Sequence, residues 1–211
     1  MLKITTKSLL LLSSLALGSV VQVRGVVFGG ADLSSPLLAG LPGEDCVKTH
    51  LHEGNPVGEV VPLGGMDTYV SVPRRDSPGP KKIFIFFSDI YGPLYQNTKL
   101  IQDQIAANGY TVLGPDYFFG DPIYLHDNEP DFDMVAWFNN KTALARAATP
   151  LWLEAVKQKY GVNGKDVKYT VSGYCFGAPY ALDVAATDDV VAASFAHPSR
   201  VTEEQFQKVK R

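Results

Sequence analysis

A tight turn around one cysteine, between an apolar strand and an apolar helix, is the feature that most constrains how this chain folds. Residues 167–172 have the composition of a strand, and residues 178–186 that of a helix. Between them stands Gly173-Tyr174-Cys175-Phe176-Gly177, a Gly-x-Cys-x-Gly pattern. The residues two before and two after the cysteine must be very small, because the strand and helix backbones approach closely there. The pattern is that of a nucleophile elbow in which cysteine replaces serine.

Cys175 is therefore the predicted nucleophile. At the start of a helix, the helix dipole and the free backbone N–H groups favour the thiolate over the thiol, so we expect a reactive sulfur. The alternative is that Cys175 is a buried small side chain and that Gly173 and Gly177 serve only a tight turn.

The remainder of the chain alternates short strands with longer helices. Residues 59–63 and 66–72 read as a hairpin joined at Gly64-Gly65, and the apolar run 82–88 reads as a central parallel strand. Further elements are expected as helices at 97–108, 143–159 and 201–211 and as strands at 110–113 and 190–196. This alternation predicts an α/β fold of three layers, with a mostly parallel sheet and helices on both faces.

Charge and length exclude several classes of function. A chain of 211 residues with a net charge of -3 has room for one domain and no excess of basic residues for a phosphate backbone, so nucleic-acid binding is not expected. No metal site is expected either. Cys46, His50 and His52 lie together, but without a second pair of ligands.

The N-terminus has the pattern of a secretory signal peptide, which we place at residues 1–25. Its apolar stretch is 16 residues long between Lys7 and Arg24, shorter than the roughly 20 residues of a membrane-spanning helix. A mitochondrial presequence is the alternative. A leader at 26–57 and a domain at 58–211 follow. Secretion would expose the sequon at Asn140 to glycosylation. Cys46 and Cys175 are not expected to pair.

Three segments together resemble the dienelactone hydrolases of the α/β-hydrolase superfamily. They are the Gly-Tyr-Cys-Phe-Gly turn at 173–177, Phe-Phe-Ser-Asp-Ile-Tyr-Gly at 86–92 and Gly-Pro-Asp-Tyr-Phe at 114–118. The resemblance covers roughly residues 46–200. The leader around Cys46 and the Ala-His-Pro-Ser segment at 196–199 are similar to fungal members in particular.

The resemblance implies a carboxymethylenebutenolidase-like hydrolysis of a small ester or lactone, through a thioester on Cys175 and without a cofactor. The backbone N–H groups of Ile90 and Phe176 would form the oxyanion hole. Asp89 takes the place of an acidic residue that contacts the resting thiol in bacterial members, and would help to deprotonate it. The alternative for Asp89 is a helix cap or a loop carboxylate.

The α/β-hydrolase order requires an acid and then a histidine after the nucleophile, each following a later strand. Only 36 residues follow Cys175, and their one histidine, His197, matches a non-catalytic position of the family. We therefore expect an incomplete domain that lacks the last strands. A catalytically inactive or binding module on the same scaffold and a redox-active thiol are the alternatives. The sequence sets no oligomeric state.

Overall fold

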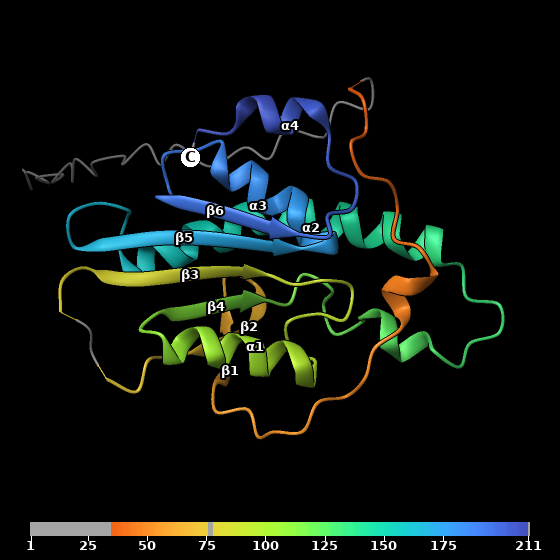
Figure 1. Ribbon diagram of the computed structural model, residues 1–211, viewed down its shortest axis with the longest axis horizontal. Helices are drawn as coiled ribbons and strands as arrows, with labels where there is room; N and C mark the ends of the chain where they lie inside the picture. Colours follow the sequence, from red (N-terminus) through yellow and green to blue (C-terminus); the bar gives the residue numbers. More distant parts are fainter. Residues whose placement is uncertain (1–34, 76–77, 211) are drawn as a thin grey trace, which may run out of the picture.

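A six-stranded sheet with the order β1-β2-β4-β3-β5-β6 forms the centre of the computed structural model (Figure 1). The structure describes residues 35–75 and 78–210, so the predicted signal peptide and the start of the leader lie outside the described residues. The strands are β1 (Glu59–Leu63), β2 (Met66–Ser71), β3 (Lys81–Phe87), β4 (Thr111–Pro115), β5 (Val167–Tyr174) and β6 (Ala192–Ala196).

The strand directions confirm the predicted mostly parallel sheet. β1 and β2 form the expected antiparallel hairpin, with Leu63 opposite Met66. Gly64 and Gly65 turn the chain with φ values of 56° and 83°, which glycine adopts readily. β2 runs antiparallel to β4, whereas β4, β3, β5 and β6 are mutually parallel. Their carboxyl ends therefore lie along one edge of the sheet.

Side chains of β3 alternate between two apolar layers, which explains the unbroken apolar run in the sequence. Ile83, Ile85 and Phe87 belong to the large core cluster that also holds residues of α2 and α3. Phe86 packs with Val112 and with Ala106 of α1 on the opposite face. The helices are α1 (Gln96–Ala107), α2 (Met134–Tyr160), α3 (Ala178–Ala185) and α4 (Glu203–Lys208). Helices thus cover both faces, as predicted.

The largest difference from the predicted elements is α2, which begins at Met134 instead of residue 143. The Asp133 side chain caps it by accepting a 2.9 Å hydrogen bond from the N–H of Ala136. The added turns bury Trp137 and Phe138, whose spacing was not used to predict the helix. Among the described residues, no helix is both long and apolar enough to cross a membrane.

Candidate active site

Cys175 lies between β5 and α3 in a strained backbone conformation, with a φ of 49°. A Cβ atom on Gly173 would lie 2.6 Å from the carbonyl carbon of Gly177, and one on Gly177 would lie 2.6 Å from that of Phe87. Both positions therefore exclude any side chain. A non-glycine residue in the left-handed region costs about 1–3 kcal/mol and persists only where its surroundings fix it. The turn has the geometry of a nucleophile elbow.

The Cys175 thiol is 2% exposed, and its environment favours the neutral form. Burial raises the pKa of Cys175 to about 12, and the negative charges of Cys46 and Asp89 act in the same direction. The Ser199 hydroxyl and the N–H of Phe176 lower it, but by less. The pKa of the thiol is thus shifted in the direction opposite to the one expected from the helix start, because burial outweighs the favourable N–H of Phe176.

Asp89 lies just after the end of β3, the strand that pairs with β5 beside the elbow. Its Oδ1 accepts a 2.9 Å hydrogen bond from the N–H of Tyr91, so the carboxylate also has a local loop role. It does not cap α1, whose N-cap is Tyr95. Burial raises the pKa of Asp89, while the Tyr91 N–H and the charge of His197 lower it. The structure thus brings Asp89 and Cys175 within electrostatic range of each other.

A cavity of about 370 Å³ opens beside Asp89 and offers space for a small molecule. Aromatic side chains of Tyr91 and Tyr95 line it together with His52 from the leader and Leu100 from α1. The rings of Tyr91 and Tyr95 are 4.8 Å apart. The lining is mostly apolar and includes the Asp89 carboxylate, whereas Cys175 is not among the residues that line this cavity.

The predicted oxyanion donors occupy adjoining segments. Phe176 follows the nucleophile, and its N–H lies close enough to the thiol to lower its pKa. Ile90, which follows β3 in the chain, is fully buried. Its carbonyl accepts a 3.0 Å hydrogen bond from the N–H of Ile123. The close packing of Gly177 on the end of β3 holds these two segments together.

The leader packs against the elbow, which the sequence did not reveal. The N–H of Arg200 donates to the carbonyl of Gly40 at 2.9 Å, and the N–H of Ser199 donates to that of Cys175 at 3.1 Å. Cys46 lies on the 3-10 helix η1 (Glu44–Val47) and packs against the large core cluster. Figure 1 shows η1, in orange, near the carboxyl ends of the parallel strands. Both cysteines are free thiols.

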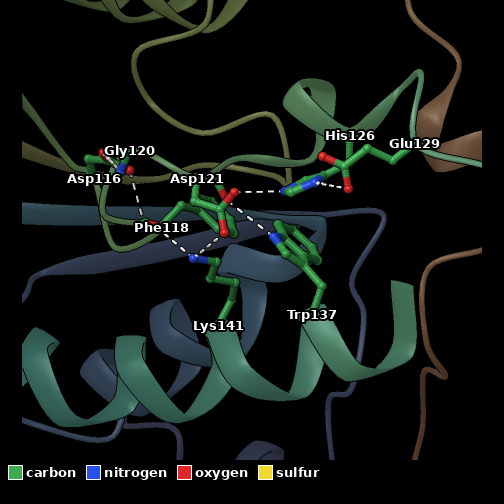
Figure 2. A network of polar contacts seen from close by, with 8 residues as sticks. All are labelled: Asp116, Phe118, Gly120, Asp121, His126, Glu129, Trp137 and Lys141. Carbon is green, nitrogen blue, oxygen red and sulfur yellow. Dashed lines mark hydrogen bonds and ion pairs between the residues drawn. The ribbon is translucent and has the colours of Figure 1, made fainter. Parts of the chain in front are cut away.

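A polar network fixes the connection between β4 and α2 next to the elbow (Figure 2). The ammonium group of Lys141 lies 2.6 Å from Asp121 and donates to the carbonyl of Phe118 at 3.1 Å. The two ring nitrogens of His126 face Asp121 at 2.7 Å and Glu129 at 3.0 Å. The ring of Phe118 lies 4.9 Å from that of Phe176, so the network supports the aromatic wall behind the nucleophile.

The positions of the four histidines limit the acid–base chemistry. In residues 35–75 and 78–210, no histidine shares a hydrogen bond with Cys175, and no three metal-ligating side chains gather into a site. His126 is occupied by two carboxylates, and His50 and His52 belong to the leader. His197 directly follows β6 and is exposed, with its ring 6.1 Å from that of Tyr174. Asn140 is exposed on α2, and its glycosylation stays a prediction.

Comparison with known proteins gives one consistent family. Residues 66–210 match the dienelactone hydrolase family. Dienlactone hydrolase 1 of Gibberella moniliformis is 37% identical over 189 residues, covering 85% of this chain and 70% of that protein. Dienlactone hydrolase 2 of the same fungus is 34% identical, covering 79% and 70%. The solved structure of m3DLH superposes with a TM-score of 0.54 at 18% identity. That match covers 73% of this chain and 65% of the solved chain, so the chain spans less than two thirds of that structure.

Proposed function

The chain belongs to the dienelactone hydrolase family, and from this premise we propose that it hydrolyses a small ester or lactone through a thioester on Cys175. The observation that carries the proposal is the conformation of Cys175, held at a φ of 49° between two glycines whose Cβ positions are filled by backbone. Such strain at a cysteine between a strand and a helix is typical of a nucleophile.

The reaction begins with the transfer of the Cys175 proton to the carboxylate of Asp89. The thiolate attacks the carbonyl carbon of the substrate, and the N–H groups of Phe176 and Ile90 stabilise the resulting oxyanion. The C–O bond breaks, and the leaving alcohol takes the proton from Asp89. Water then cleaves the thioester, which releases the acid and restores the thiol. The sequence of steps consumes only ester and water, so it needs no cofactor.

A second candidate function is binding without turnover on the same scaffold. The raised pKa of Cys175 and the absence of a histidine hydrogen-bonded to it among the described residues favour this reading. Both functions would place the ligand in the cavity beside Asp89.

The test is the reaction of the purified full chain with p-nitrophenyl acetate, beside the Cys175→Ala and Cys46→Ala variants. We expect release of p-nitrophenolate by the wild type and an acetyl group on Cys175 in its intact and peptide masses. Cys175→Ala should lose both, whereas Cys46→Ala should keep the acetylation of Cys175. Ligand binding with no acetylated cysteine would replace hydrolysis by the binding function.

We also propose secretion, on the basis of the N-terminal pattern, and a mature chain that starts close to residue 26. N-terminal sequencing of the protein from culture medium tests this. Retention of Met1 on the protein inside the cell would contradict it.

A further inference from the structure

Ser199 is tied to the nucleophile through its backbone. β5 and β6 run in parallel, with Tyr174 opposite Ala196, so the chain that leaves β6 passes beside the elbow (Figure 1). Beyond β6, the N–H of Ser199 donates to the carbonyl of Cys175 at 3.1 Å. The two residues are therefore in direct contact although they are distant in sequence.

The segment around Ser199 is fixed by contacts on both sides. His197 and Arg200 have φ values of 36° and 50°, left-handed conformations that are costly for non-glycine residues and persist only where contacts hold them. The N–H of Arg200 donates to the carbonyl of Gly40 at 2.9 Å, and its guanidinium donates to Oδ1 of Asn139 at 2.7 Å. The leader and α2 thus hold Ser199 in place beside the elbow.

The hydroxyl of Ser199 is buried without a partner in the resting protein. Ser199 is 3% exposed, and within residues 35–75 and 78–210 its Oγ makes no hydrogen bond of ordinary geometry. Leaving a buried hydroxyl unpaired is costly, so most buried polar groups in native proteins are paired and each exception calls for an explanation. The hydroxyl faces the thiol of Cys175, whose pKa it lowers. A group that is unpaired at rest beside a nucleophile is placed to gain its partner during the reaction.

The other titratable groups around the thiol do not stabilise its ionised form. Burial is the largest cause of the raised pKa of the thiol, and the charges of Cys46 and Asp89 add to it. The buried phenol of Tyr117 feels the charge of the sulfur in turn. The stabilising groups are the N–H of Phe176 and the Ser199 hydroxyl. A neutral thiol is a weak acceptor, whereas a hydrogen bond to an ionised acceptor is strong, so the hydroxyl gains its bond only when the proton leaves the sulfur.

We propose that Ser199 is a further catalytic residue of the site, whose hydroxyl donates a hydrogen bond to the sulfur of Cys175 once the thiol has lost its proton. The inference rests on the proposed hydrolysis and deepens it. The proton of Sγ goes to the carboxylate of Asp89, and the hydroxyl of Ser199 keeps its own proton, so the total charge does not change. The new bond raises the fraction of thiolate that is ready to attack, and an interaction that is stronger in the reacting state than at rest accelerates the step.

The direct test is alkylation of Cys175 by iodoacetamide in the purified full chain, at a fixed pH well below the pKa of the thiol and followed in the mass of the Cys175 peptide. Ser199→Ala should slow the alkylation roughly 3- to 10-fold. A hydrogen bond to a charged group changes the thiolate population about 10- to 100-fold, and the more basic thiolate of the variant recovers part of the rate through its greater nucleophilicity. Loosening of the elbow would act in the opposite direction, because a thiol that is 2% exposed would become more accessible. Unchanged or faster alkylation in Ser199→Ala overturns the inference.

Ser172→Ala is the matched control, because Ser172 is a buried serine of β5 whose hydroxyl accepts a 3.0 Å hydrogen bond from that of Ser194. It should leave the alkylation rate unchanged but lower the urea midpoint, since a hydrogen bond is lost. Ser199→Ala should show the opposite pattern, slower alkylation with a midpoint no lower than that of the wild type. A lower midpoint would mean that the Ser199 hydroxyl is already bonded in the resting protein, and equal slowing in Ser172→Ala would mean that the effect is not specific. Either result contradicts the proposal.

Alkylation also separates this inference from the proposed function, because iodoacetamide reacts with the thiolate without any hydrolysis. In an active protein, the first-turnover release of p-nitrophenolate should fall in Ser199→Ala by a factor similar to that of the alkylation rate. If the wild type forms no acetyl-thioester, the proposed hydrolysis fails, while the alkylation rates still decide whether Ser199 stabilises the thiolate of Cys175.

Discussion

Replacing Gly177 by alanine tests whether close backbone packing holds the elbow on β3. The φ of Gly177 is -76°, a value that alanine adopts freely, so the substitution adds a steric effect without backbone strain. The new Cβ would lie 2.6 Å from the carbonyl carbon of Phe87 and 2.7 Å from the carbonyl oxygen of Ser88. The carbonyl oxygen of Phe87 would lie closer still, so ordinary contact at about 3.4 Å requires a backbone movement of about 1 Å.

The neighbouring strand has little freedom to move away, because β3 is paired with β4 on one side and with β5 on the other. Overpacking of this kind costs about 1–3 kcal/mol, and we expect Gly177→Ala near the upper end because the obstacle is backbone. With a denaturant slope of about 2 kcal/mol/M, the urea midpoint should fall by roughly 1–1.5 M. Unfolding followed by tryptophan fluorescence and circular dichroism measures the shift, and coincident curves show that one transition is being compared.

Gly164→Ala is the matched control, because its Cβ would meet only the carbonyl oxygen of Val162 at 3.8 Å, an ordinary contact. Its free energy of unfolding should change by no more than about 0.5 kcal/mol. Equal midpoints for the two variants would refute the argument that the elbow needs glycine for close packing.

Two further perturbations address the electrostatics around the site. Burial lowers the pKa of His126, but Glu129 and Asp121 raise it by more, so its net shift is upward. Its contribution to stability is therefore complete below the ordinary value of about 6.5 and is lost as pH rises through the raised folded pKa. The urea midpoint of wild type minus that of His126→Gln should be larger at about pH 6 than at about pH 8.5, and a difference independent of pH would contradict this. After burial, the charge of Cys46 is the next cause of the raised pKa of Cys175, so Cys46→Ser should shift iodoacetamide labelling of Cys175 to lower pH, and an unshifted profile would exclude this coupling.

Features that depend on local sequence were predictable. The elbow could be identified because Gly173 and Gly177 flank a cysteine between a strand and a helix, and the central strand because its apolar run is unbroken. The first turns of α2 were missed because the polar residues 139–142 interrupt the apolar pattern before residue 143. The side-chain cap by Asp133 starts the helix earlier.

Features that depend on burial or on distant contacts were not predictable. The helix dipole at Cys175 is visible in sequence, but the burial that raises its pKa comes from packing of the whole core. Cys46 stands in a leader without periodicity, and its position near the thiol depends on contacts with residues around 200. His197 was assigned by family position alone, whereas its left-handed backbone, with a φ of 36°, is visible only in the structure.

The pairing of the leader with the region after β6 sets an order of assembly for the site. Ser35 accepts a hydrogen bond from the N–H of Glu204 across 169 positions of sequence, and the N–H of Leu38 donates to the carbonyl of Val201. During synthesis the leader leaves the ribosome early, whereas its partners around residue 200 emerge only after all six strands have been made. The hairpin and the first parallel strands can form while the leader is still undocked, and contacts of such long range form late. The surface near Cys175 therefore closes only after the residues around 200 have emerged, and until then the nascent chain exposes its thiol.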